Sequence, residues 1–348
     1  YKKLISEKKL FSKNKKKIII QPSSVDLSLS NECYEISSSF LSPYKSVRNK
    51  LQNLIIKKID LSKKYIFKKN KTYIVKINEE LRLENDICGF CNPKSSTGRL
   101  DIFCRVILDN CNQYEKIPKN YKGEIFIEIT TRSFDIELIQ GDTLNQMRLA
   151  FKKNQYVSDN VLKKMQKKKS FVFDENNLVI KPFFRNGLEV SVDLSEKNKI
   201  NAYVAKKNTP VLIFRKKKYH KIIDFWQPVK SNQNSLIIKK NKFYILKSKE
   251  KIRIPNNMAG EMIPYDTGLG DFRVHYAGFF DPGFGELNGT FAVLEVKTNE
   301  VSFLLEDCQT IARIKYEKLN KNCSVVYGSS IKSNYHNQSL TLSKHFIY

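Results

Sequence analysis

The sequence predicts an all-β protein made of two tandem barrel or jelly-roll domains with short helices. Short alternating strands follow one another along the chain, with frequent turns and little helical periodicity. The 348 residues are too many for one ordinary core, and 41% of them are hydrophobic, so we expect two globular domains. The third observation is an internal repeat.

Five short segments of the first half return in the second half in the same order. The offset between the copies ranges from 165 residues (144 to 309) to 171 residues (69 to 240). The pairs are Ser24–Ser28 with Ser191–Ser195, Lys69–Ile74 with Lys240–Ile245, Leu81–Leu83 with Ile252–Ile254, Ile127–Ile129 with Leu294–Val296, and Leu144–Arg148 with Gln309–Arg313. We therefore predict a tandem duplication with domains at residues 1–165 and 166–348, joined by the lysine-rich, linker-like run Lys163–Lys169.

The first elements can be predicted in chain order. Residues 1–17 are lysine-rich with apolar residues at helical spacing, which predicts a short amphipathic helix. Residues 18–29 predict a strand, a proline turn and an alternating strand, and residues 65–83 are again strand-like. Residues 102–107 form an apolar run that indicates a buried strand.

The net charge of +27 raises the question of a nucleic-acid or membrane partner. Lysines greatly outnumber arginines and are spread along the whole chain, so we predict neither partner. The seven cysteines are an odd number and no secretory leader is evident, which favours reduced thiols in the cytoplasm. No apolar stretch approaches the roughly 18 residues that a membrane-spanning helix needs.

The loop Asn92–Asp101 precedes the strand at 102–107 and gathers Lys94, Ser95, Ser96 and Arg99. Cations and hydroxyls at the mouth of a strand suit a ligand that is anionic at one end and polar at the other, such as a nucleotide. A solvated polar turn is the simpler interpretation of the same residues.

Two glutamates occupy matching places in the halves. Glu128 and Glu295 each stand among apolar neighbours on a predicted strand. Such a glutamate either lies on a solvated face or is desolvated and suited to general base chemistry.

The sequence gives little support for a metal site or for the common nucleotide-binding fingerprints. Cys88 and Cys91 offer only two metal ligands, and the four histidines show no ligand spacing with them, so we predict no metal site and no zinc. No Walker loop or Rossmann fingerprint is present.

The loop Asn92–Ile107, the Glu128 strand and Gly141–Arg148 together resemble the dCTP deaminase branch of the dUTPase-like superfamily. The resemblance covers nearly the whole chain and is greatest to the bacterial type with two tandem domains. Gly187–Leu194, Asp224–Pro228 and His275–Gly285 extend it through the second half. It implies a distorted dUTPase-like barrel, a homotrimer with interface sites, and zinc-independent hydrolysis of dCTP to dUTP and ammonia. Mg²⁺ would accompany the triphosphate.

The resemblance also implies roles for individual residues. Ser95 matches the serine that positions the water and the pyrimidine, and Arg99 matches the active-site arginine. Glu128 matches the glutamate that activates water, Lys94 stands at a phosphate-facing basic position, and Gln146 matches a nucleotide-contacting glutamine. Ser96, Arg148 and Asp281 are further candidate substrate-binding residues.

The second half departs from the family pattern. It has Pro264–Gly270 where the serine–arginine loop is expected, whereas it keeps an Asp281-Pro282-Gly283 turn that the first half lacks at Ile117–Tyr121. We expect the first domain to carry the catalytic loop. Glu128 and Glu295 are both candidates for the base, of which we favour Glu128, and a composite site is the alternative to a site within one domain. The alternatives are a dUTP diphosphatase or a bifunctional enzyme, with Asp281 or Asp26 activating water, and a non-catalytic nucleotide- or nucleic-acid-binding protein.

Overall fold

The computed structural model describes residues 1–13, 17–150, 156–264, 272–274, 278–285, 288–298, 301–319 and 338–348. The contacts between residues divide the chain into two compact units. Unit 1 contains Tyr1–Asn154, Lys207–His220 and Ile347, and unit 2 contains Gln155–Lys206, Lys221–Phe346 and Tyr348. Both units consist mainly of strands with short helices, which confirms the all-β prediction. The domain boundary between residues 165 and 166 stays a prediction.

The elements of unit 1 are mostly strands. They are α1 (Lys2–Ser6), β1 (Leu10–Ser12), β2 (Ile19–Ile20), β3 (Val25–Ile36), α2 (Val47–Leu51), β4 (Ile55–Asp60), β5 (Tyr65–Phe67), β6 (Thr72–Arg82), β7 (Cys88–Pro93), α3 (Ser95–Gly98), β8 (Ile102–Ile107), β9 (Lys116–Ile117), β10 (Lys122–Thr131), β11 (Ile136–Leu138), β12 (Thr143–Ala150) and β16 (Leu212–Ile213).

The elements of unit 2 repeat this pattern. They are α4 (Asp159–Lys168), β13 (Val172–Phe173), β14 (Leu188–Ser191), β15 (Ala202–Ala205), α5 (Ile222–Phe225), β18 (Trp226–Val229), β19 (Ser235–Ile238), β20 (Phe243–Ile252), β21 (Met258–Pro264), β22 (Phe272–Val274), β23 (Phe279–Phe280), β24 (Thr290–Thr298), β25 (Phe303–Glu306) and β26 (Thr310–Lys318). The short strands β17 (His220–Lys221) and β27 (Phe346–Ile347) each contain residues of both units.

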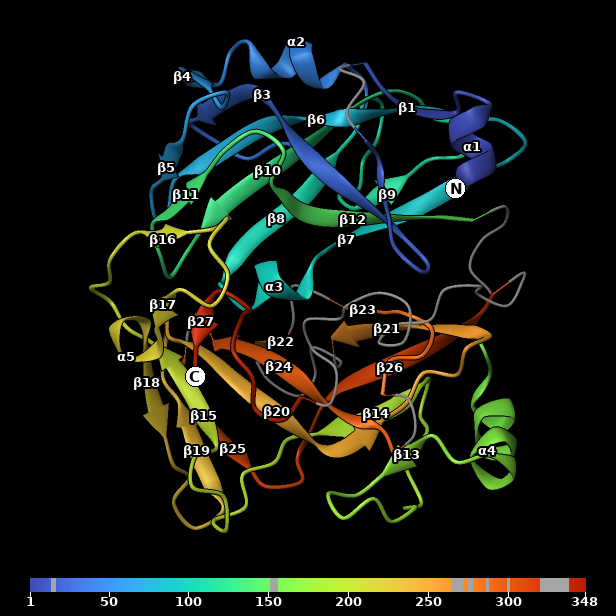
Figure 1. Cartoon of the computed structure of the whole chain (residues 1–348), viewed down its shortest axis with the longest axis vertical. Helices are drawn as coiled ribbons and strands as arrows, with labels where there is room; N and C mark the ends of the chain where they lie inside the picture. Colours follow the sequence, from blue (N-terminus) through green and yellow to red (C-terminus); the bar gives the residue numbers. More distant parts are fainter. Residues whose placement is uncertain are drawn as a thin grey trace. The chain divides into compact units, whose positions relative to one another are not determined.

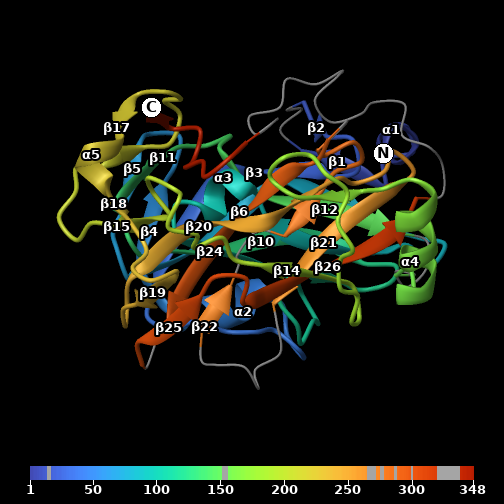
Figure 2. The same cartoon turned by 90° about the horizontal axis from the view of Figure 1, so that it is seen from below.

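Each unit wraps its strands around its own core. Among the described residues of unit 1, one large sheet has the order β8-β10-β6-β3-β12-β7-β9, and a small sheet has the order β16-β11-β5 (Figure 1). The described strands of unit 2 form sheets of order β18-β15-β20-β24-β22 and β14-β26-β21-β23, with β19 paired to β25 (Figure 2). A single tryptophan, Trp226, is fully buried in unit 2 beside Phe243.

The strand registers show that the two units are copies of one plan. Glu128 lies opposite Ile74 in unit 1, and Glu295 lies opposite Ile245 in unit 2. These pairs keep the offsets of the sequence repeat. The Ile117 and Phe280 strands also correspond, because they pair with Gly89 and Gly260 respectively.

Two of the five repeat matches were wrong in register. Ser28 lies opposite Thr143 and Ser191 opposite Thr310, so Ser191 corresponds to Ser28 and not to Ser24. By the same comparison Arg313 corresponds to Gln146 rather than to Arg148. Both slips are by an even number of residues. An even shift keeps every side chain on the same face of a strand, so the apolar alternation cannot reveal it.

Two other expectations need correction. The helix expected over residues 1–17 covers only Lys2–Ser6, because Leu10–Ser12 pairs with β6 as strand β1. The expected linker Lys163–Lys169 lies mostly within helix α4. Asp159 in the first turn and Lys167 and Lys168 in the last turn complement the helix dipole, and Leu162 is buried. A lysine-rich run is therefore the exposed side of a helix.

A carboxylate holds the same strand crossing in both units, where Glu79 is buried and Glu250 is half-buried. Glu79 accepts hydrogen bonds from the backbone N–H and the hydroxyl of Ser28, each at 2.8 Å. Glu250 accepts the same pair from Ser191 at 3.0 and 2.5 Å. Burial raises the pKa of both glutamates. The serine side chain and backbone are satisfied away from water by one carboxyl group.

Replacing Glu250 tests this contact. We expect Glu250→Ala to lower the free energy of unfolding by about 2–3 kcal/mol, because two buried donors of Ser191 lose their acceptor. Glu250→Gln keeps one acceptor oxygen and should lose less. Urea unfolding of the two variants measures the difference, and Glu79→Ala and Glu79→Gln provide the matched pair in unit 1. Unfolding of Glu250→Ala at the wild-type urea midpoint would contradict the assignment.

Candidate active site

Strand β7 delivers the candidate loop of unit 1. Lys94 has an extended backbone and stands immediately before the short helix α3, which contains Ser95 and Ser96. The Lys94 N–H donates to the Leu144 carbonyl at 2.9 Å, and the Thr97 hydroxyl donates to the same carbonyl at 2.8 Å. These bonds fix the loop on β12. Ser95 and Lys94 are half-buried, whereas Ser96 is buried.

The Lys94 ammonium group is held between two strands. It forms an ion pair with Asp26 on β3 and donates a hydrogen bond to the Thr143 hydroxyl at 3.2 Å. Gln21 also donates to Asp26, at 3.1 Å. The other carboxylate oxygen, Oδ1, is buried and has no hydrogen-bond partner among the described residues. A polar ligand bound here would therefore contact a positive side chain, Lys94, and a negative one, Asp26.

The nucleotide-contacting candidates lie on the adjacent strand β12. Gln146 faces Asp26 on one side and Asn92 on the other, and its side-chain oxygen accepts a hydrogen bond from Ser24 at 3.1 Å. Arg148 lies two residues along the same strand and is buried. Strands β3, β12 and β7 thus bring Lys94 and Gln146 beside Asp26.

Arg99 ends helix α3 and is 3% exposed. Asp101, two residues later, is fully buried and has a left-handed backbone conformation with φ of 54°. Its carboxylate accepts from the Ser133 hydroxyl at 2.7 Å. The chain is thus turned sharply between the loop and strand β8.

Glu128 belongs to a second group of polar residues, on strands β10 and β8. It is 1% exposed, so the solvated-face alternative for this residue is wrong. Arg105 lies directly opposite in the register, and its guanidinium donates to Glu128 Oε1, with the closest nitrogen at 2.5 Å. The Ser39 hydroxyl donates to Oε2, also at 2.5 Å. Both carboxylate oxygens therefore have donors that compensate for the loss of water.

Aromatic rings hold the arginine in place. The Arg105 guanidinium carbon lies 3.6 Å from the Tyr114 ring centre and 4.3 Å from the Phe103 ring centre. The Tyr114 hydroxyl is 2.9 Å from Ser39 Oγ and donates to the Phe40 carbonyl at 3.1 Å. Arg105 thus has a cation–π contact in addition to its ion pair.

Glu115, the residue after Tyr114, ties the two groups together. Its buried carboxyl group accepts from the Asn145 side-chain amide at 3.0 Å, and Asn145 in turn accepts from the Asn92 N–H at 3.1 Å. Burial raises the pKa of Glu115 to about 8. The carboxyl group is therefore predominantly protonated at neutral pH, which avoids the cost of a buried charge.

Gly89 and Cys91, both on strand β7, have structural explanations. A Cβ atom on Gly89 would lie 2.3 Å from the Arg148 carbonyl oxygen, so the close approach of β7 to β12 requires glycine there. Cys91 and Cys104 are buried, and burial raises the pKa of both thiols well above the usual value. Within the described ranges, no three histidine, cysteine or acidic side chains gather as they would to hold a metal ion.

The candidate residues of unit 2 are only partly visible. Glu295 is as buried as Glu128, at 1% exposure. Asp281 is half-buried and opens the turn that contains Gly283. The predicted loop from Tyr265 to Gly270 lies outside the described residues. His275, the residue after Val274 in the sequence, also lies outside the described residues.

Sequence reasoning did not find Arg105, Ser39, Tyr114 or Glu115. The alternation Phe103-Cys104-Arg105-Val106 carried a signal for Arg105, because an arginine inside an apolar strand needs a partner. Ser39 and Tyr114 lie in segments without periodicity, and only the fold brings them to Glu128.

Comparisons with known proteins point to one enzyme family over nearly the whole length of the chain. The N-terminal domain profile of 2'-deoxycytidine 5'-triphosphate deaminase matches residues 1–154, and the C-terminal domain profile matches residues 158–346. Among solved structures, the chain is similar to 2'-deoxycytidine 5'-triphosphate deaminase from Agrobacterium tumefaciens, with 37% identity and a TM-score of 0.87. That match covers 94% of this chain and 96% of the other. A search of curated proteins found no match.

No helix in the described part of the chain has both the length and the apolar character needed to cross a membrane.

The pKa of Glu115 predicts a pH-dependent stability. The folded state keeps a proton that the unfolded chain, with its ordinary pKa of 4.5, releases, so folding is favoured at low pH and weakened as the pH rises from 4.5 to about 8. The side chain of Glu115→Gln cannot titrate. We therefore expect the wild type to lose about 3 kcal/mol more of its free energy of unfolding between pH 5 and pH 8 than this variant does. Urea unfolding at pH 5, 6.5 and 8 measures this. The exposed Glu306→Gln serves as control, and a wild-type slope in Glu115→Gln would refute the assignment.

Proposed function

The chain belongs to the 2'-deoxycytidine 5'-triphosphate (dCTP) deaminase family, and from that premise we propose which of its residues carry the reaction. The enzyme is a hydrolase that acts on a C–N bond: it converts dCTP to dUTP and ammonia. The match of both domain profiles, together covering residues 1–154 and 158–346, carries this function. The roles of individual residues below are our proposals.

We propose Glu128 as the general base. Its burial and its contacts with Arg105 and Ser39 support this role, because they hold both carboxylate oxygens in fixed positions. Glu295 has the same register position and burial in unit 2 and is the alternative base.

A single carboxylate is enough for all the proton transfers of the reaction. Glu128 takes one proton from water as the oxygen attacks C4 of cytosine, and gives it to the ring nitrogen N3. It then takes the second proton from the new C4 hydroxyl and gives it to the departing amine. The C4–N bond then breaks, ammonia leaves, and the carbonyl of uracil remains. One glutamate thus acts first as base and then as acid.

The loop residues bind and orient the nucleotide in this proposal. Ser95 positions the water and the pyrimidine, and Arg99 stabilises the negative charge that develops during attack. Lys94, Ser96, Gln146 and Arg148 bind the sugar and the phosphates, and Asp281 contributes from the second unit. The proximity of Lys94 and Gln146 to Asp26 supports a shared polar site.

We further propose zinc-independent chemistry, with Mg²⁺ entering on the triphosphate. The partnerless oxygen of Asp26, beside Lys94, fits a water molecule of such a hydrated ion. Magnesium would neutralise phosphate charge, while the protein residues would orient the base.

We propose a homotrimer with composite sites and a cytoplasmic location. The trimer rests on the family resemblance. The cysteines among the described residues are free thiols, which supports a reducing compartment.

Product analysis tests the activity directly. We expect dCTP and Mg²⁺ to yield ammonia and dUTP in equal amounts, with no change on addition of a zinc chelator. Ammonia with dUMP and pyrophosphate would instead identify the bifunctional enzyme. No turnover of dCTP by the folded protein would contradict the deaminase function.

Matched glutamate variants test the base. We expect Glu128→Gln to lower kcat at least about 1,000-fold while dCTP binding changes only a few-fold, because the shape is kept and proton transfer is lost. Glu295→Gln should retain near wild-type kcat. The reverse outcome would assign the base to Glu295.

A further inference from the structure

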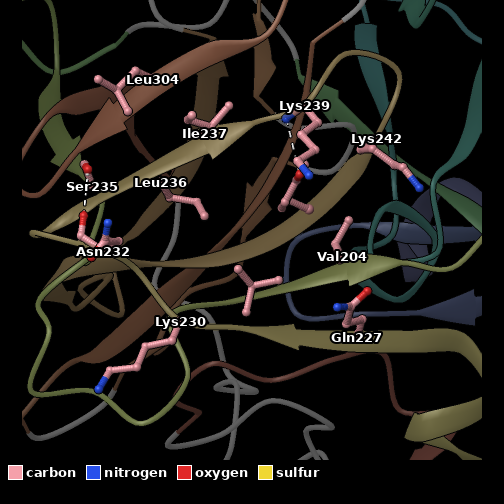
Figure 3. Close-up of a pocket in the computed structure, with 12 residues that line it drawn as sticks. Val204, Gln227, Lys230, Asn232, Ser235, Leu236, Ile237, Lys239, Lys242 and Leu304 are labelled. Carbon is pink, nitrogen blue, oxygen red and sulfur yellow. Dashed lines mark hydrogen bonds between the residues drawn. The ribbon is translucent and has the colours of Figure 1, made fainter.

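A pocket of about 450 Å³ lies in unit 2, and its lining includes none of the candidate loop residues. Val204, Leu236 and Tyr244 supply apolar lining, and Lys230, Lys239 and Lys242 supply positive charge. Figure 3 shows Lys230 and Lys242 on opposite sides of the residues drawn, with Lys239 nearer to Lys242. A cavity of this size can hold a small organic ligand.

The backbone around this pocket has a counterpart in unit 1. The Lys239 N–H donates to the Tyr244 hydroxyl at 3.2 Å, as the Lys68 N–H donates to the Tyr73 hydroxyl at 3.1 Å. Ile238 pairs with Phe303 as Phe67 pairs with Ile136. The two places can therefore be compared position by position.

In unit 1 the lysines at these positions are neutralised. Lys71 forms an ion pair with Glu35 at 2.6 Å, and Lys68 forms one with Asp135 at 3.0 Å. Tyr73 lies opposite Glu35 and fixes its position in the register.

In unit 2 both lysines remain and both carboxylates are gone. Val204, opposite Tyr244, takes the place of Glu35, and Ser302 takes the place of Asp135. Neither Lys239 nor Lys242 forms an ion pair with any residue that the structure describes. A retained cation without its counter-ion leaves an uncompensated positive field.

Two further positions also differ, and together they add positive charge to unit 2. Lys230 follows Val229, where Asp60 follows Ile59 in unit 1. At six equivalent positions unit 1 therefore has three cations and three carboxylates, whereas unit 2 has three cations and no carboxylate. The unit 1 positions are Glu35, Lys57, Asp60, Lys68, Lys71 and Asp135, and the unit 2 positions are Val204, Gln227, Lys230, Lys239, Lys242 and Ser302.

A smaller side chain also opens space in unit 2. In unit 1 the Tyr65 ring packs edge-on against Tyr73, with centres 6.2 Å apart, and Lys57 lies over it. Leu236 occupies the place of Tyr65, since it pairs with Leu305 as Tyr65 pairs with Leu138. Leu236 lines the pocket.

We propose that this pocket of unit 2 binds a small organic phosphate, with the phosphate groups on Lys230, Lys239 and Lys242 and the apolar part on Val204 and Leu236. Lysines are frequent throughout this chain, so three of them alone would mean little. The proposal rests on the joint loss of carboxylates and ring around Lys239 and Lys242, which keep the positions and the backbone contacts of Lys68 and Lys71. Ammonium groups bind phosphate oxygens as point charges. None of the proposed catalytic residues lines this pocket.

Lysine acetylation, read residue by residue by mass spectrometry, tests the site in the intact protein. The probes are inorganic tripolyphosphate and, separately, deoxythymidine triphosphate, which has no C4 amino group to lose. We expect saturating probe to slow acetylation of Lys239 and Lys242 at least about threefold, while the ion-paired Lys68 and Lys71 keep their rates. Protection by deoxythymidine triphosphate at lower concentration than by tripolyphosphate would show that the apolar lining contributes.

The matched variant restores the unit 1 carboxylates. Val204→Glu with Ser302→Asp should abolish the protection and leave dCTP deamination unchanged. Lys181→Glu, elsewhere in unit 2, lowers the net charge by the same two units and should keep the protection. The proposal is overturned if neither probe protects, if the double variant is protected like wild type, or if all exposed lysines are protected equally. Deaminase activity of the same samples reports separately on the catalytic assignment.

Discussion

The buried hydrogen bond between Asn145 and Glu115 holds together the region of unit 1 on which both groups of site residues depend. Asn145 also accepts the Asn92 N–H, two residues before Lys94, while Tyr114 packs on the arginine that neutralises Glu128. A charged carboxylate at this position would oppose folding, whereas a protonated one both satisfies the amide and adds no charge. The candidate site is thus positioned by a residue that need not touch substrate.

Duplication has preserved the backbone plan of the two units more closely than their surfaces. The same carboxylate–serine crossing occurs at Glu79 and Glu250, and the same register surrounds Glu128 and Glu295. Glu79, Glu128 and Glu295 are buried, where an unpaired polar atom is costly. The buried Glu35 of unit 1 is replaced in unit 2 by the apolar Val204, which leaves no buried charge unpaired there. Unit 2 could therefore lose the counter-ions of its lysines without losing its fold.

The sequence predicted the fold class, the duplication and the buried strand at 102–107, because alternation and repetition are local signals. It misplaced two repeat matches by even numbers of residues, which alternation cannot detect. Within the candidate site, the loop at Lys94 and the glutamate at 128 stood out by residue type. Ser39 and Tyr114 did not, since their closeness to Glu128 depends on segments far apart in the chain.

The position of Trp226 has a practical consequence. It is the sole tryptophan of the chain and is fully enclosed in unit 2, among Phe243 and Phe346. Indole fluorescence excited at the red edge of protein absorption therefore reports the melting of unit 2 alone, while far-ultraviolet circular dichroism registers the strands of both units. Comparing the two signals reveals whether the duplicated halves unfold as one cooperative body or in separate steps.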